Sequence, residues 1–65
     1  MYDLLGVNGN AFHVMGYVAH AMRECRKTKS EIDAYYADAK SDNYDHLLAV
    51  SLEMIDKLNE EKSNE

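Results

Sequence analysis

The 65-residue chain contains no proline, no tryptophan, three glycines and one cysteine. A single cysteine cannot form a disulfide within the chain, and a free Cys25 thiol is typical of a reducing cytosol. Glycine occurs only at Gly6, Gly9 and Gly16, so that after residue 16 only polar clusters interrupt the chain. This pattern predicts helices joined by short loops.

Long apolar runs and targeting signals are also missing. The longest uncharged stretch, residues 4–19, contains three glycines, two asparagines and His13, and is therefore not expected to span a membrane. The first six residues have neither a basic region nor a long apolar segment, so no signal peptide is expected. We therefore expect a cytoplasmic protein.

The length restricts the chain to one small domain. A chain of this size buries only about 60% of its unfolded surface, which makes a lone monomer marginally stable. Its composition, 46% hydrophobic and 29% charged, is that of a folded protein rather than a disordered one. Because no internal disulfide is available, we expect either a very regular helical core or association with another chain, such as a homo-oligomer.

The expected organisation has three parts: an N-terminal arm at residues 1–9, a single helical domain at 10–59 and a frayed polar tail at 60–65. Asn10 offers a side-chain oxygen that can cap a first helix. This helix is expected from Ala11 to about Lys27. Its apolar face is formed by Phe12, Met15, Val18, Ala19 and Met22.

A second helix is expected over residues 29–40. Thr28-Lys29-Ser30-Glu31 has the capping-box pattern, and Ser30 with Asp33 is the alternative frame. The apolar face of this helix is formed by Ile32, Tyr35, Tyr36 and Ala39. Tyr35 and Tyr36 are adjacent and cannot both face the same core. One of them is expected to be exposed or buried against another chain, where aromatic residues are enriched.

A third helix is expected after Ser41 or Asp42, either of which can serve as its cap. Its apolar face is formed by Tyr44, Leu47, Leu48, Ser51, Ile55 and Leu58. Together the three patterns predict an all-α fold, a small three-helix bundle with a short N-terminal arm.

Charge is distributed unevenly along the chain. Residues 1–30 carry two acids and four bases, a net charge of +2, whereas residues 31–65 carry ten acids and three bases, a net charge of −7. The early bases are Arg23, Arg26, Lys27 and Lys29. They are interpreted either as solvated charges that complement the helix dipole or as a site for an acidic or phosphate-bearing partner. A sequence pI near 5.0 argues against duplex DNA binding.

No combination of residues indicates a metal site or catalysis. His20 and Glu24 lie four residues apart, with His13 and Cys25 near them, but paired metal-ligand spacings are missing. Asp45 and His46 are interpreted as residues of a helix start rather than as an acid–base pair. The sequence also lacks a phosphate-binding glycine loop and a nucleophile motif. We therefore expect no enzyme activity and no cofactor.

Several short motifs resemble a group of small bacteriophage and prophage proteins to which no activity is attached. The motifs are Gly9-Asn10-Ala11-Phe12, then Gly16, Ser30-Glu31-Ile32 and Tyr44-Asp45-His46-Leu47-Leu48. The resemblance covers about residues 6–48 and implies only an origin in a mobile element. The chain differs from the group in two places. Its first loop, Arg26-Lys27-Thr28-Lys29, lacks the usual glycine, and its residues 52–58 have a helical pattern.

A chain of such origin is expected to act inside a bacterial host, where small acidic phage proteins often work by occupying a host protein. Inhibition of a bacterial immune protein, as by anti-CRISPR proteins, is the expected function by analogy with other small acidic phage proteins. The expected partner-binding residues are Asp33, Asp38, Asp42 and Asp45, with Tyr35 or Tyr36 as the aromatic anchor. The alternatives are a structural or regulatory homo-oligomer, and a small-nucleotide sponge that uses the basic residues and a tyrosine.

Overall fold

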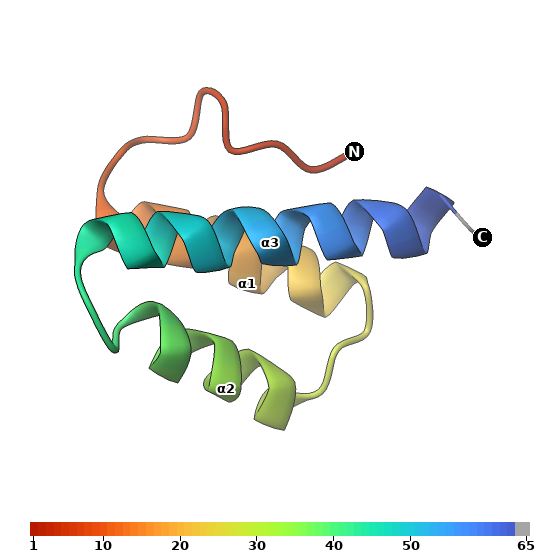
Figure 1. Cartoon of the computed structure of the whole chain (residues 1–65). Helices are drawn as coiled ribbons and strands as arrows, with labels where there is room; N and C mark the ends of the chain where they lie inside the picture. The colour runs from red at the N-terminus through yellow and green to blue at the C-terminus, as the bar shows by residue number, and fades with distance from the viewer. Residues whose placement is uncertain (64–65) are drawn as a thin grey trace.

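The computed structural model describes residues 1–63, which form three helices: α1 (Ala11–Glu24), α2 (Lys29–Ala39) and α3 (Tyr44–Ser63). Helices α1 and α3 run in the same direction, and α2, which separates them in the sequence, runs in the opposite direction (Figure 1). All three helices pack against one another. The predicted all-α three-helix bundle with an N-terminal arm is confirmed.

A single apolar core fills the space between the helices. Met22, Val18 and Leu58 are its most deeply buried large apolar side chains. The remaining core residues come from all three helices and are Val14, Met15, Ala19, Ala21, Ile32, Tyr35, Ala39, Leu47 and Ile55. The predicted apolar faces are largely confirmed, with two exceptions. Phe12 is 78% exposed and Tyr44 is 41% exposed. Each lies in the first turn of its helix, beyond the edge of the core.

One hydroxyl pair lies inside this core. Ser51 is fully buried and is the one buried polar side chain among residues 1–63. Its Oγ lies 2.7 Å from the hydroxyl oxygen of Tyr35, and Tyr35 is only 3% exposed. Each hydroxyl therefore satisfies the other in a place that water does not reach.

Side-chain oxygens cap the start of each helix. Asn10 Oδ1 accepts a hydrogen bond from the Phe12 amide at 2.8 Å, and Thr28 Oγ1 accepts one from the Glu31 amide at 3.1 Å. These bonds confirm the first cap and the Thr28 frame of the second. At the start of α3 the cap is Asn43, whose Oδ1 accepts from the His46 amide at 2.9 Å. The prediction of Ser41 or Asp42 as this cap was wrong.

Ser41 and Asp42 instead organise the turn before α3. Ser41 Oγ donates to the Asp38 carbonyl at 2.7 Å, at the C-terminal end of α2. Asp42 Oδ1 accepts a hydrogen bond from the Asn43 amide at 2.8 Å. With both side chains used in this way, the first residue in position to satisfy a free amide of α3 is Asn43.

Helix α1 ends at Glu24, three residues earlier than predicted. The Lys27 amide donates to the Met22 carbonyl at 2.9 Å and the Arg26 amide to the Arg23 carbonyl at 3.0 Å. These two bonds form a Schellman motif, in which the residue after the C-cap adopts a left-handed conformation. Arg26 occupies that position with φ of 63°, where glycine is usual. The chain therefore makes its first turn without the glycine.

The N-terminal arm packs on its own bundle, alongside α1 and α3 (Figure 1). The Tyr2 amide donates to Asn59 Oδ1 at 2.7 Å, and Asn59 Nδ2 donates to the Tyr2 carbonyl at 2.9 Å. The Asp3 amide donates to the Tyr17 hydroxyl at 2.9 Å. At the far end of the arm the Tyr44 hydroxyl donates to the Gly9 carbonyl.

The polar tail is partly helical rather than frayed. Helix α3 continues through residues 60–63, and Glu61 Oε1 lies 2.6 Å from Lys27 Nζ in the α1–α2 loop. This ion pair gives the last turns of α3 a tertiary contact that composition alone does not show. Residues 64–65 of the predicted tail lie outside the described residues.

Candidate functional site: a groove between α2 and α3

A groove of about 430 Å³ lies between α2 and α3. Its floor is formed by Met22 and Tyr35, which are both buried core residues. Its apolar walls are formed by Ala34, Val50 and Met54. The rim carries charged side chains from both helices and the first loop, namely Lys27, Glu31, Asp38, Glu53 and Lys57.

The helical repeat explains why these residues meet. Glu31, Ala34 and Asp38 follow one another at three- and four-residue spacing along α2 and therefore share a face. The residues from α3 have the same spacing and face them across the seam. The small side chain of Ala34 leaves a notch there, and Val50 and Met54 remain only half-buried. The groove therefore presents accessible apolar surface between two charged edges.

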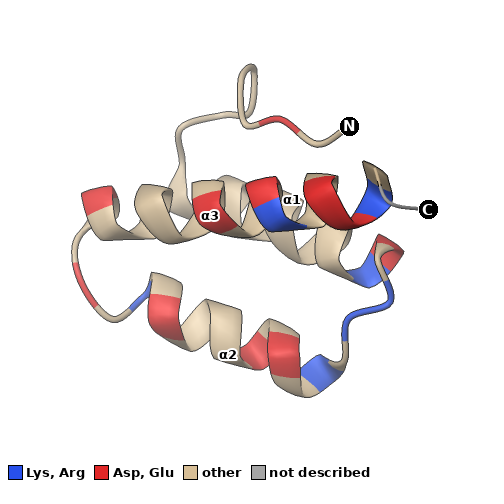
Figure 2. Ribbon diagram, turned by 45° about the vertical axis from the view of Figure 1, so that its right-hand side comes forward, with Lys and Arg blue, Asp and Glu red and all other residues tan. Residues whose placement is uncertain are grey.

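The net charge of the rim is more negative than a count of its charged residues suggests. The side chain of Lys27 is only 16% exposed and is paired with Glu61. The hydrogen bond that Lys27 donates to Glu61 raises the pKa of this lysine, so that Lys27 stays charged and neutralises Glu61. The three rim carboxylates of Glu31, Asp38 and Glu53 are then offset only by Lys57 among the rim residues. Figure 2 shows the acidic residues along α2 and α3 and the basic residues near the first loop.

The four predicted partner-binding aspartates do not form one surface. Asp38 lies on the groove rim. Asp42 and Asp45 lie at the α2–α3 turn and in the first turn of α3. Asp33 lies with the basic residues, where its Oδ2 is 2.9 Å from Lys29 Nζ. The structure thus brings Asp38 together with the unpredicted acids Glu31 and Glu53.

Of the two candidate aromatic anchors, only Tyr36 is accessible. Tyr35 is buried in the core, so its prediction as a possible surface anchor is wrong. Tyr36 is half-buried, with its ring centroid 5.7 Å from that of Tyr35. Lys40 Nζ lies 5.7 Å from the centroid of the Tyr36 ring, within the range of a cation–π contact. One ring therefore fills the core while the other covers its edge.

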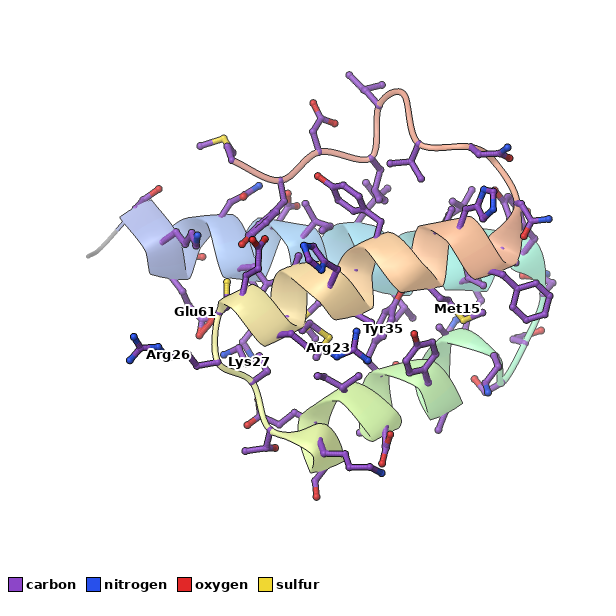
Figure 3. The ribbon with its side chains drawn as sticks, turned by 180° about the vertical axis from the view of Figure 1, so that it is seen from behind. Met15, Arg23, Arg26, Lys27, Tyr35 and Glu61 are labelled. Atoms are coloured by element: carbon purple, nitrogen blue, oxygen red, sulfur yellow. The ribbon has the colours of Figure 1, made fainter. Side chains whose placement is uncertain are left out.

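The basic residues form a second depression, on the α1–α2 side of the molecule. Arg23, Lys27 and Lys29 line a volume of about 460 Å³ together with Ile32, Asp33 and Tyr36. Lys27 and Lys29 are already paired with carboxylates. Arg26 lies outside this depression and extends away from the bundle, whereas Lys27 meets Glu61 (Figure 3). Three of the four predicted anion-binding residues thus line one depression, and Arg26 does not.

His46 links the end of α2 to the start of α3. Its Nε2 lies 3.1 Å from Asp38 Oδ1 and 3.0 Å from the Asp38 carbonyl oxygen. The hydrogen bond with the Asp38 carboxylate raises the pKa of His46. The sequence placed His46 beside Asp45 in the first turn of a helix and gave no partner for its ring. The carboxylate that the ring contacts is that of Asp38, eight residues away across the α2–α3 turn.

The histidines, cysteine and carboxylates of residues 1–63 form no group of three or more that could hold a metal ion. His20 Nε2 lies 3.8 Å from Glu24 Oε2, and Cys25 Sγ lies 3.7 Å from the Tyr2 hydroxyl. Among the described residues, no helix is both long enough and apolar enough to cross a bilayer.

The groove had only a weak signal in the sequence. An alanine between two acids at helical spacing, Glu31-x-x-Ala34-x-x-x-Asp38, is compatible with an exposed helix face. Only the packing of α2 on α3 shows that this face borders an apolar seam. Comparison with protein families, curated proteins and solved structures found no match to this chain.

Proposed function

We propose that this chain is a non-enzymatic, phage-type binding protein that inhibits a host protein. Its α2–α3 groove binds a basic, partly apolar segment of that protein. The observation that supports this proposal is the combination of an apolar floor and an acidic rim in one groove. An amphipathic helix with apolar residues on one side and lysine or arginine on its flanks is complementary to such a groove.

Inhibition follows from the charge of the segment that is bound. Basic segments of nucleic-acid-handling proteins contact phosphates, and an acidic rim attracts the same cations. A segment held in the groove is therefore withdrawn from its nucleic acid. The proposed target class is a bacterial immune protein of this kind, which would make the activity anti-CRISPR-like.

A peptide titration tests the groove directly. The probe is a lysine–leucine peptide of about five helical turns, designed with all leucines on one face, and its control has the same composition in scrambled order. In the NMR spectrum of the labelled chain, we expect the patterned peptide to shift the amide signals of Ala34, Val50 and Met54. Equal shifts with the scrambled peptide, or shifts confined to other residues, would contradict the proposal.

Two alanine substitutions provide the matched control for this titration. Ala34→Leu fills the notch, whereas Ala49→Leu adds the same side chain to an exposed position of α3 outside the groove. We expect Ala34→Leu to weaken peptide binding by about tenfold and Ala49→Leu to leave it unchanged. Equal affinity for both variants would show that the peptide binds elsewhere.

A capture experiment then tests inhibition. The immobilised chain is incubated with a bacterial extract and compared with Glu53→Lys, a rim variant, and Glu60→Lys, which makes the same charge change outside the groove. We expect a protein that is retained by the wild type and by Glu60→Lys and is lost with Glu53→Lys. The purified target must also bind nucleic acid less well when the chain is added; unchanged nucleic-acid binding would refute inhibition.

A second candidate function is binding of a small nucleotide in the basic depression. The observation that favours it is the presence of the Tyr36 ring beside Arg23 and Lys29, since a base can stack on an aromatic ring while cations hold its phosphates. Against it, Lys29 is already paired with Asp33. Calorimetric titration with a panel of cyclic nucleotides separates the two: heat that disappears in Arg23→Ala supports this candidate, and flat titrations remove it.

A further inference from the structure

A large aromatic side chain is exposed at the start of α1. Phe12 is 78% exposed, although its apolar spacing predicts a core position. Its backbone is fixed, because its own amide donates to the capping oxygen of Asn10. The ring therefore projects outward from a well-defined position.

A depression of about 260 Å³ lies directly beside this ring. Its interior is apolar and is lined by Met15, Ala39 and Leu47 at the edge of the core. Tyr44 forms part of the border and is held there by its hydrogen bond to the Gly9 carbonyl. A cavity of about 150 Å³ is enough to hold a benzene molecule, so that this depression has room for one phenyl ring.

The same surface carries one charge of each sign. Lys40 ends α2 and Asp42 lies two residues further along, and both line the depression. Both side chains are exposed. The surface thus contains a projecting ring and a hollow that can receive it, together with a cation and an anion.

We propose that this surface, defined by Phe12, the depression, Lys40 and Asp42, binds a second copy of the chain around a two-fold axis. In such a dimer the Phe12 ring of each copy enters the depression of its partner, and each Lys40 faces the partner's Asp42. A two-fold interface requires a surface that is complementary to itself. This surface carries both the projecting Phe12 ring and a depression that can hold such a ring. Binding to a foreign partner would require only one of these two features.

The dimer surface is separate from the α2–α3 groove, since the two share no lining residue. The inference therefore goes beyond the proposed function and does not depend on it. It also accounts for how so short a chain gains buried apolar area without a disulfide.

Sedimentation equilibrium of the full chain, from micromolar to millimolar concentration, is the test. We expect a reversible monomer–dimer equilibrium. Phe12→Ala removes two rings from the interface, one from each copy. Full burial of one such ring strengthens association by at least about tenfold. The dissociation constant of the dimer should therefore rise by about a hundredfold. Leu52→Ala is the control, because it removes an exposed apolar side chain of α3 outside the depression, and it should leave the constant unchanged.

Charge reversal tests the two-fold arrangement itself. Lys40→Glu places two like-charged pairs in the dimer, as does Asp42→Lys, and each should weaken association by about tenfold. The double variant restores opposite charges and should recover most of the affinity. Circular dichroism at a concentration where all variants are monomeric checks that each is folded.

Three results would overturn the inference. They are a chain that remains monomeric up to millimolar concentration, a dimer whose dissociation constant is the same for Phe12→Ala and the wild type, and a double charge variant no stronger than the single ones. The peptide titration at the α2–α3 groove can succeed or fail independently of each.

Discussion

Removing either hydroxyl of the buried Tyr35–Ser51 pair leaves the other without a partner inside the core. Ser51 is fully buried and Tyr35 is 3% exposed, with 2.7 Å between their hydroxyl oxygens. A buried polar group that loses its only partner costs about 1–3 kcal/mol. In Ser51→Ala the tyrosine hydroxyl loses the one side-chain partner that the structure gives it, so that we expect the free energy of unfolding to fall by about 2 kcal/mol.

The other variants have smaller expected costs. In Tyr35→Phe the Ser51 hydroxyl can rotate onto the backbone carbonyl four residues earlier in α3, so the loss is about 1 kcal/mol. The double variant removes both polar groups and leaves two apolar side chains in contact. Its stability should lie within about 0.5 kcal/mol of the wild type. The two substitutions are therefore expected to be strongly non-additive.

Thermal unfolding followed by circular dichroism measures these differences at one low protein concentration. For a domain of this size, about 1 kcal/mol corresponds to about 4–8 °C in Tm. Ser51→Ala should therefore unfold about 8–16 °C below the wild type, and the double variant close to it. A double variant that loses the sum of the two single losses would refute the reasoning, because the hydroxyls would then contribute independently.

An alkaline titration gives a second measurement on the same pair. Burial raises the pKa of Tyr35 above 10.0, and the hydrogen bond with Ser51 lowers it in part. Because the folded state holds the phenol proton more tightly than the unfolded chain does, this contribution to stability is present below pH 10 and is lost as the pH rises through the folded value. Ser51→Ala should move the ionisation of Tyr35, followed by tyrosinate absorbance, to higher pH.

Three further substitutions test the helix ends. Asn43→Ala removes the cap of α3 and should cost about 1 kcal/mol in chemical denaturation, whereas Asp42→Ala should cost less; equal costs would contradict the assignment of the cap. Arg26→Gly should raise stability by about 0.5–1 kcal/mol in the same assay, because glycine adopts the left-handed conformation without strain; a loss would show that the Arg26 side chain is itself stabilising. The raised pKa of His46 contributes stability below about pH 6.5 that is lost as the pH rises through the folded value. Asp38→Asn should reduce this pH dependence of Tm, because the carboxylate is the largest cause of the raised pKa; an unchanged dependence would refute the contact.

Much of the fold could be predicted because it depends on local patterns. Apolar spacing located all three helices, and the Asn10 and Thr28 caps set the start of the first two. The errors occur where two side chains compete for one role. The prediction named Ser41 or Asp42 as the cap of the third helix, but both side chains bind within the preceding turn and Asn43 is the cap. Spacing alone cannot decide such a competition.

The site could be predicted less well because it depends on how helices face one another. The acidic character of residues 31–65 is evident in the sequence, but the groove arises only when Ala34 meets Val50 and Met54 across the α2–α3 seam. Similarly, the periodicity that includes Phe12 cannot show that α1 begins beyond the edge of the core. The ion pair between Lys27 and Glu61 joins residues that are 34 apart in the chain. A local sequence pattern therefore cannot predict it.

The contact between Tyr2 and Asn59 has a consequence for the order of folding. It closes a loop of 57 residues, and the entropy lost in closing a loop increases with its length. The helices and their turns involve much shorter separations, so the bundle can assemble before the arm is in place. The first residues of the chain are thus expected to be the last to find their position, and to be the first to leave it when the protein opens.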